Sequence, residues 1–511
     1  MSIKRYFNFD FPPAVVVFLI ALPLCLGIAL ASGAPMFSGI IAGIAGGIIA
    51  GFFSGSNLSV SGPAAGLTTI VLAAITEVGS YPIFLSCVVL AGLLQVGLGF
   101  IRAGGIGHFV PVSVIKGMLC SIGIILILKQ LPHAFGYDTD FEGDEMFIQG
   151  DGRNTFTEIL QAFDYITPGA LLLAIISIVI LILWEGNRMR AMKFVQYLPG
   201  PLVVVFIGIV TNYFFIAVIP GMAITESNHL VSVPVLSSLG DFPSLFTLPD
   251  FSRLGDSKIY TIAATIAIVA SLETLLNIEA CDKLDPFRRI TPLNRELKAQ
   301  GIANIFSGLI GGLPVTSVVV RSSANINAGA RTKASAITHG FILLFAILAI
   351  PTVLQLIPLA SLAAILLVVG FKLTKPELYK SMWGKGMSQF MPFMATVLGV
   401  LFTDLLMGVF IGLIVAVYFI LKTNFREAIL MVSEEKNYLI RFTKDVSFLN
   451  KATLRSRLQS VPNGASLLID ATKANFIDND IHETIEDFVE EAKAKNINVD
   501  LKNVLHSKSE Y

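Results

Sequence analysis

Two short polar segments interrupt otherwise apolar sequence, and their residue types could bind an ion. The first break covers Ser59–Gly66, and the second break covers Pro314–Ser317. Within a bilayer, irregular backbone persists only where protein or a watery cavity surrounds it. Helical sequence resumes after each break, and the first turn of a helix leaves N–H groups unpaired and carries partial positive charge. Two such ends that meet inside a membrane predict an anion site.

The small residues of the breaks would let an ion approach the backbone closely. The residues expected to border the anion are Ser61, Gly62, Pro63, Ala64, Ala65, Thr316, Ser317 and Val318. The alternative is tight helix–helix packing through small residues. That alternative suits a single Gly-rich segment, whereas a matched pair of breaks favours a binding site.

Two charged residues lie deep in apolar sequence near the breaks. Arg321 follows the second break, and an intramembrane Arg is a functional candidate because burying its charge is costly. It could add positive field to the anion site or pair with a carboxylate. Glu273 could exchange a proton near neutral pH, or bind a cation together with Asn277, one turn later on the same helix face. A structural ion pair with Arg321 or a nearby Lys is the alternative.

The composition is that of a polytopic membrane protein. The 511 residues are 54% hydrophobic and 14% charged, whereas soluble domains carry about 25% charged residues. The net charge is zero, so no nucleic-acid partner is expected. The four cysteines lack metal-ligand spacing, and no catalytic triad or phosphate loop is evident. No enzyme activity, cofactor or metal is therefore expected.

Hydropathy predicts fourteen membrane-spanning helices with both termini on the cytoplasmic side. Lys and Arg clusters fall inside in this arrangement, and the acidic loop 132–166 falls outside. The predicted helices cover residues 14–31, 36–53, 63–77, 82–101, 109–131, 167–184, 198–218, 258–278, 295–312, 317–328, 334–350, 353–371, 389–404 and 406–422.

A short internal repeat divides these helices into two sets of seven. The sequence Phe53-Ser54-Gly55 recurs as Phe306-Ser307-Gly308, before the second break. Because seven is odd, the second copy has the opposite orientation, which is typical of an alternating-access carrier. Repeat one covers about residues 10–220 and repeat two about residues 255–423 of a transporter domain at 1–423.

The C-terminal residues read as a small soluble α/β domain. Alternating strand and helix patterns begin near Tyr438 and end near Leu501. We expect a linker at 424–436 and this domain at 437–511.

The chain resembles the bacterial sulfate permease (SulP) family of anion transporters along essentially its whole length. The motifs that carry this resemblance are Val60-Ser61-Gly62-Pro63, Ser271-Leu272-Glu273 and Arg321-Ser322-Ser323-Ala324-Asn325, and the tail resembles a STAS domain through Leu468-Ile469-Asp470 and Phe476-Ile477-Asp478. The resemblance implies a uracil-permease-like fold with core and gate domains, and a homodimer. It also implies an anion between the first, third, eighth and tenth helices, which adds Leu24 and Cys25 to the substrate site. Glu273 takes the position of the proton- or sodium-coupling carboxylate.

Three departures from the family pattern refine this reading. Many members have Pro-Gln where this chain has Pro23-Leu24, so one polar substrate contact is lost and the sequence is closer to the bicarbonate-transporting branch. That branch tends to have Asp for sodium, so Glu273 favours protons. The STAS turn Asp478-Asn479-Asp480 lacks a hydroxyl to phosphorylate, which favours docking or dimer contact over a phospho-switch.

The sequence therefore predicts a secondary active transporter of a small inorganic anion, bicarbonate or sulfate. We expect proton or sodium coupling and elevator-like movement in the lipid of the inner (plasma) membrane. The alternatives are a dicarboxylate or nucleobase carrier on the same fold, and an uncoupled anion channel or exchanger. A scaffold organised by the C-terminal domain is the remote alternative.

Overall fold

The computed structural model describes residues 9–63, 65–138, 154–186, 189, 192, 195, 198–231, 233, 245–426 and 428–504. The chain divides into two compact units, Met1–Leu413 and Ile414–Tyr511. The boundary between the units falls inside the last long helix, α20 (Leu405–Arg426).

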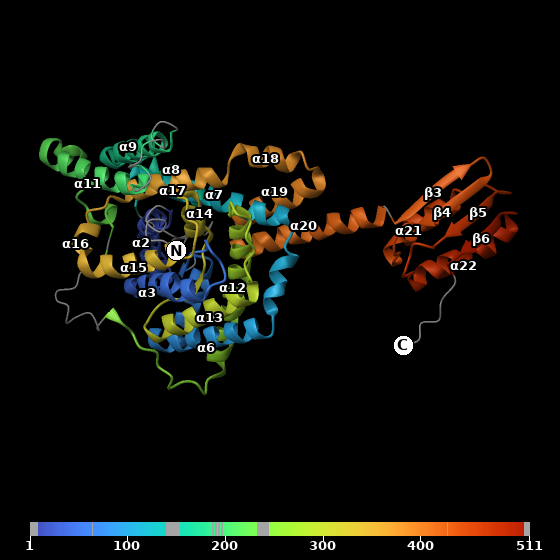
Figure 1. Ribbon diagram of the computed structural model, residues 1–511, viewed down its shortest axis with the longest axis horizontal. Helices are drawn as coiled ribbons and strands as arrows, with labels where there is room; N and C mark the ends of the chain where they lie inside the picture. The colour runs from blue at the N-terminus through green and yellow to red at the C-terminus, as the bar shows by residue number, and fades with distance from the viewer. Residues whose placement is uncertain are drawn as a thin grey trace. The chain divides into compact units, whose positions relative to one another are not determined.

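The first unit is helical apart from two short strands (Figure 1). Its helices are α2 (Phe11–Ala31), α3 (Met36–Ile44), the π-helix η1 (Ala45–Ala50), α4 (Gly51–Phe53), η2 (Ala65–Leu67), α5 (Thr68–Val78), α6 (Tyr81–Phe100), η3 (Ala103–Phe109), α7 (Val112–Phe135), α8 (Thr155–Ala162), α9 (Pro168–Glu185), α11 (Gly200–Val218), η5 (Pro220–Met222), η6 (Ser227–His229), α12 (Ser257–Leu284), α13 (Leu293–Leu309), α14 (Val319–Asn327), α15 (Ala334–Ala349), α16 (Pro351–Leu354), α17 (Leu359–Leu373), α18 (Pro376–Trp383) and α19 (Met387–Phe402). Its strands are β1 (Ser61–Pro63) and β2 (Val315–Ser317).

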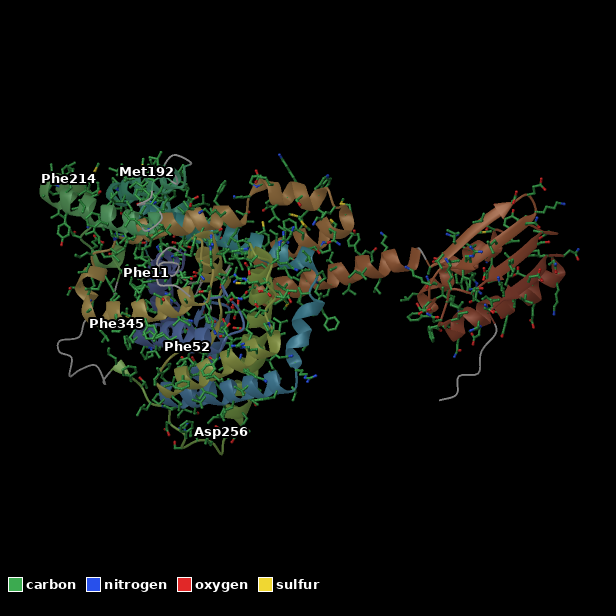
Figure 2. The ribbon with its side chains drawn as sticks, viewed as in Figure 1. Phe11, Phe52, Met192, Phe214, Asp256 and Phe345 are labelled. Atoms are coloured by element: carbon green, nitrogen blue, oxygen red, sulfur yellow. The ribbon has the colours of Figure 1, made fainter. Side chains whose placement is uncertain are left out.

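Nine helical segments in the described part of the chain are long and apolar enough to cross a membrane. Three shorter apolar helices, α5, α15 and α19, accompany them. Phe52, Phe214 and Phe345 lie on such helices and are each more than half exposed (Figure 2). Large apolar side chains directed outward from a helical bundle match a hydrocarbon surrounding.

A helix lies in each of the fourteen intervals predicted from the sequence, and the starts of α5 and α17 differ most from the prediction. Helix α5 begins at Thr68 instead of residue 63, because β1 and the 3₁₀ turn η2 occupy the preceding residues. Helix α17 begins at Leu359 instead of residue 353, with Pro358 as its N-cap, because Pro has no N–H to donate and disfavours helical geometry in the residue before it.

The helices of the first unit pack as two groups. In the core group, α13 and α12 pack against α6, and α3, α14 and α15 pack against α2. In the gate group, α17 and α19 pack against α7, and α9 packs against α11 and α17. Helix α20 completes the gate group, since Gly408 lies against Val400 of α19. The two short strands lie in the core group, where β2 contacts α12 and α13.

The second unit is a small α/β fold with a hydrophobic core of its own. Its elements are β3 (Ile429–Glu434), β4 (Asn437–Phe442), η8 (Phe448–Asn450), α21 (Lys451–Gln459), β5 (Ser466–Asp470), α22 (Asn479–Ala494) and β6 (Asn498–Lys502). The strand order is β3-β4-β5-β6, with β3 antiparallel to β4 and the other pairs parallel. Strand β3 lies in the residues expected to be a linker, where Ile429 is buried and pairs with Phe442.

Candidate functional site

The two breaks lie side by side in the core group, as the sequence predicted. Strands β1 and β2 pair antiparallel, with Ser61 opposite Ser317 and Gly62 opposite Thr316. The N–H of Val318 then donates to the carbonyl of Val60 at 3.0 Å. Both strands are buried throughout. This pairing satisfies backbone groups that would otherwise be unpaired inside the bilayer.

Each strand leads into a half-length helix. Helix α14 starts directly after β2, with Val318 as its N-cap, and α5 starts after β1 and η2. The N-terminus of α14 therefore adjoins the strand pair, where its partial positive charge favours an anion. Ala65 lies in η2, whereas Ala64 lies outside the described residues.

Side chains of α14 bind the backbone of the first break. The Ser322 hydroxyl accepts a hydrogen bond from the N–H of Val60 at 2.9 Å, and the Asn325 amide donates to the carbonyl of Leu58 at 2.9 Å. Helix α14 thus lies in the second predicted repeat but stabilises the irregular backbone of the first break. The two breaks are built as a single unit.

A polar stripe on α13 supports both breaks and was missed in the sequence. The spacing of four, four and three residues places these side chains on one helix face, and all are completely buried. They are Glu296, Gln300, Asn304 and Ser307. The predicted helix over 295–312 contains all four residues, and the observed helix α13 begins two residues earlier, at Leu293. The periodic polar spacing was the signal that could have revealed the stripe.

Arg321 lies in the first turn of α14 and is completely buried. Its Nη2 lies 3.3 Å from Cys25 Sγ, while Nε and Nη1 have no hydrogen-bond partner among the described residues. Its guanidinium lies against Gly62, since a Cβ there would be 2.0 Å from Nη1. A cation at a helix N-terminus is unfavourable unless an anion joins it. The geometry therefore favours a role in the anion site over a carboxylate pair.

Glu273 and Asn277 lie on consecutive turns of α12 and contact different breaks. A Cβ on Gly66 would lie 3.2 Å from Glu273 Oε1, so this carboxylate faces the last residue of the first break. Asn277 donates from Nδ2 to the carbonyl of Ser317 at 2.5 Å, and its Oδ1 has no partner among the described residues. The Glu273 carboxylate and this Oδ1 are the oxygens that could hold a coupling cation.

Cys25 and Leu24 lie at the middle of α2, directly after Pro23. Cys25 is fully buried between Arg321 and α3, where a Cβ on Gly43 would be 2.7 Å from its Sγ. Leu24 is also buried, at 5% exposure. Helix α2 therefore borders the Arg321 guanidinium through Cys25.

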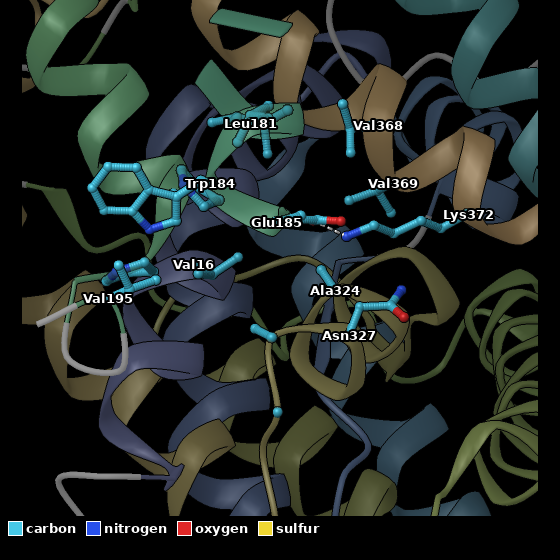
Figure 3. Close-up of a pocket in the computed structure, with 16 residues that line it drawn as sticks. Val16, Leu181, Trp184, Glu185, Val195, Ala324, Asn327, Val368, Val369 and Lys372 are labelled. Carbon is cyan, nitrogen blue, oxygen red and sulfur yellow. Dashed lines mark hydrogen bonds and ion pairs between the residues drawn. The ribbon is translucent and has the colours of Figure 1, made fainter. Parts of the chain in front are cut away.

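Two cavities lie along the boundary between the core and gate groups. The first, of about 360 Å³, is lined by Ala324 and Asn327 of α14 and by Leu181, Glu185 and Lys372 of the gate group (Figure 3). Glu185 and Lys372 form an ion pair inside it. The second, of about 780 Å³, is largely apolar and extends from Gly66 to α20.

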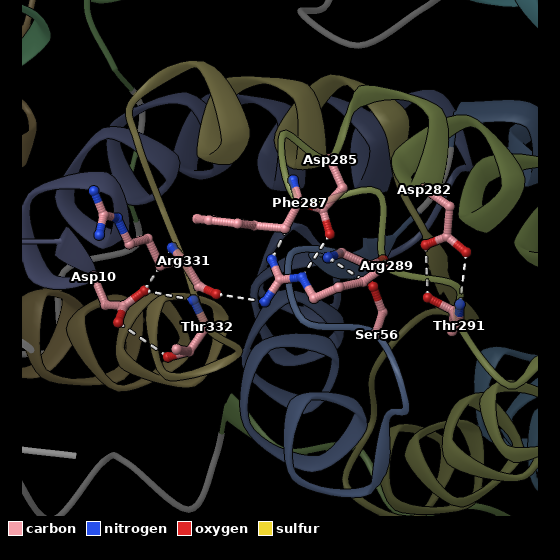
Figure 4. Close-up of polar contacts among 10 residues, drawn as sticks. Asp10, Ser56, Asp282, Asp285, Phe287, Arg289, Thr291, Arg331 and Thr332 are labelled. Atoms are coloured by element: carbon pink, nitrogen blue, oxygen red, sulfur yellow. Dashed lines mark hydrogen bonds and ion pairs between the residues drawn. The ribbon is translucent and has the colours of Figure 1, made fainter.

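A network of ion pairs and hydrogen bonds fixes the loops at one end of the core group (Figure 4). Asp10 accepts from the N–H groups of Arg331 and Thr332 at 3.0 and 2.8 Å. Arg289 donates to the carbonyl of Arg331 at 2.8 Å and pairs with Asp285 at 2.6 Å. Burial alone would raise the pKa of Asp285, but the Arg289 hydrogen bond and the Phe287 N–H lower it below its usual value. This network joins the start of α2 to the loops on either side of α13 and α14.

The sequence model of the sulfate permease family matches residues 7–396. The chain belongs to this family. Membership in the sulfate permease family makes the chain a multi-pass membrane transporter of anions. The described site, with its paired breaks and buried Arg321, lies wholly within the matched residues.

Individual members and solved structures agree with this assignment. The bicarbonate transporter BicA of Picosynechococcus is 29% identical over 360 residues, which are 69% of this chain and 59% of that protein. The solved transmembrane domain of a cyanobacterial BicA has a TM-score of 0.56 at 25% identity, covering 82% of this chain and 98% of that one. The structure of SLC26A9 shares the fold with a TM-score of 0.67 at 16% identity, covering 99% of this chain and 86% of that one.

Proposed function

We propose that this sulfate permease family member carries bicarbonate or sulfate across the inner membrane, coupled to protons or sodium. The observation that carries the proposal is the buried Arg321 in the first turn of α14, whose Nε and Nη1 have no hydrogen-bond partner among the described residues. The Thr316 hydroxyl, also without a partner among the described residues, lies on the adjoining strand. Together they present donors and positive charge to a small anion.

The choice between the two anions rests on the relatives. BicA is named for bicarbonate and the family for sulfate, and both anions are small, with oxygens that accept several hydrogen bonds. Uptake of labelled bicarbonate, sulfate, fumarate and uracil into proteoliposomes tests the proposal, under imposed proton or sodium gradients. Uptake of bicarbonate or sulfate is expected. Transport of uracil or fumarate alone would reject the anion assignment.

Coupling is assigned to Glu273, with Asn277 as its companion. A carboxylate at 5% exposure faces the first break, so neutralising it by a proton or cation changes the field felt by a nearby anion. We predict that Glu273→Gln abolishes gradient-driven accumulation but leaves anion exchange. Both are measured in proteoliposomes, and Glu77→Gln, an exposed carboxylate at the end of α5, is the control. Unchanged accumulation in Glu273→Gln would remove this residue from coupling.

The remaining parts of the proposal concern movement and assembly. The apolar cavity between the core group and α20 offers few polar contacts to break, which suits sliding of the core past the gate. We assign the small α/β fold, whose sheet begins with β3 at Ile429 and not at residue 437, to a STAS domain with a docking role. We also propose a homodimer with cytoplasmic termini and no enzymatic activity. Cross-linking in native membranes and protease access from each side test these assignments.

A further inference from the structure

A buried pair of side-chain amides connects the second break to helix α12. Asn304 of α13 is completely buried and binds both backbone groups of Val315, accepting from its N–H at 2.5 Å and donating to its carbonyl at 3.0 Å. Asn304 also donates to Oε1 of Gln95 on α6 at 2.6 Å. Gln95 is completely buried and donates in turn to the hydroxyl of Ser271 on α12 at 3.3 Å. Four elements are joined by this chain.

The direction of every hydrogen bond in the chain follows from the backbone of Val315. A backbone N–H only donates and a carbonyl only accepts, so Asn304 has one amide orientation that satisfies both. Its second Nδ2 hydrogen then points to Gln95, which must present Oε1 to it. The Nε2 of Gln95 is therefore left to face Ser271. The orientation of both amides is set by the break itself.

The far end of the chain reaches the helix that carries the coupling carboxylate. Ser271 lies two residues before Glu273 and three before Thr274, whose hydroxyl accepts from the N–H of Ser317 at 3.5 Å. Ser271 and Thr274 share one face of α12, so this face is bound to β2 both directly and through the amides. Glu273 points elsewhere, to the turn at Gly66. Helix α12 is thus fixed to the second break while its carboxylate lies against Gly66, at the end of the first break.

We propose that Gln95 and Asn304 are positioning residues that make ion binding at Glu273 and anion binding at the breaks depend on each other. This inference rests on the proposed coupled transport. If α12 could shift relative to β2, binding of a proton or cation at Glu273 would move the helix and leave the breaks unchanged. Because the amides hold α12 against β2, binding of the proton or cation acts instead on the backbone at Gly66 and on the anion beside it. The quantity at stake is the linkage factor, by which the ion changes the anion dissociation constant.

The test compares Gln95→Met with Gln130→Met. Both are buried helix glutamines, but Gln130 lies on α7 of the gate group, away from the breaks. Sulfate and bicarbonate binding is measured on the full chain in detergent, at low and high pH and with and without sodium. Gln95→Met removes both hydrogen bonds of Gln95, and the loss of its link to Ser271 should lower the linkage factor about three- to tenfold, toward one. The dissociation constant without the ion should change less than about twofold. Gln130→Met should keep the wild-type linkage.

Ser271→Ala provides a milder variant that breaks the same chain at its other end. It should reduce the linkage factor as Gln95→Met does, and the double variant should lose no more than either alone. Wild-type linkage in either single variant would overturn the inference. An equal shift of the anion dissociation constant with and without the ion would also overturn it, since that indicates a purely structural role. Absence of linkage in the wild type would instead reject the proposed coupling and this inference with it.

Discussion

Replacing Arg321 by Gln should abolish tight anion binding without weakening the fold. Arg321 is completely buried, and its contact with Cys25 Sγ is its single hydrogen bond to the described residues. Removing one partner of a buried ion pair usually destabilises a protein, because the other charge is left unpaired. Here no described carboxylate pairs with Arg321, so the substitution removes an uncompensated charge instead. Anion affinity and anion-free stability should therefore change in opposite directions.

The magnitudes follow from the two N–H groups that Arg321 offers. A hydrogen bond to a charged group contributes about 1.5–3 kcal/mol, so losing two should weaken anion binding by about 3 kcal/mol or more. That corresponds to a rise of about a hundredfold or more in the dissociation constant. In anion-free buffer, replacing an unfavourable buried charge should stabilise the fold by about 1–4 kcal/mol.

Thermal unfolding with and without sulfate or bicarbonate measures both effects on one sample. A ligand at about one hundred times its dissociation constant should stabilise the wild type by about 2.7 kcal/mol, and the variant should lose this gain. Lys298→Gln is the control, because Lys298 is a half-buried cation on α13 that lies over the Phe100 ring, 3.9 Å from its centroid. The reasoning is refuted if Arg321→Gln has a lower unfolding temperature than the wild type without anions and still binds sulfate or bicarbonate.

Two further substitutions test the packing and the electrostatics of the described residues. Gly46→Ala should prevent folding of the core group, because the new methyl would lie 2.4 Å from the carbonyl of Ser61. The control variant Gly97→Ala should fold, because its new methyl meets nothing within 4 Å. Gel filtration in detergent distinguishes the folded from the unfolded variant. His229→Gln should have a lower unfolding temperature than the wild type, by a difference that depends on pH. The unfolding temperatures of both proteins are measured across a pH series. Asp138 accepts from His229 at 2.5 Å and raises the pKa of His229, and although burial raises the pKa of Asp138, the hydrogen bonds from its His partners lower it. The contribution of His229 to stability is complete below about pH 6.5 and is lost as the pH rises through its raised pKa. The contribution of Asp138 to stability is complete above about pH 3.9 and is lost as the pH falls through its lowered pKa. The effect of His229→Gln should thus be largest between these values, and a constant difference across the series would contradict it.

The membrane-spanning pattern and the two breaks were readable from the sequence because a bilayer constrains composition strongly. A helix that crosses a bilayer needs about 20 consecutive apolar residues, so its position is clear in the sequence. Each predicted interval accordingly contains a helix. Gly, Pro and polar residues in such sequence are conspicuous for the same reason. Arg321 and Glu273 were equally visible, since deeply placed charges are rare. Their roles in binding and coupling stay predictions.

The hydrogen-bonded frame around the breaks was decided by the tertiary structure alone. Asn304 and Gln95 are 209 residues apart, and neither the breaks nor the apolar pattern indicates that they meet. Val60 and Ser322 are 262 residues apart and lie in different predicted repeats. Whether a buried amide binds backbone, another side chain or an ion depends on side-chain directions that periodicity does not define. The sequence by itself therefore determined where the polar breaks and charges lie, whereas the fold determined which groups form hydrogen bonds with them. The physical reason is that a polar group inside a membrane needs a hydrogen-bond partner from the protein, and the packing of the helices decides which partner is within reach.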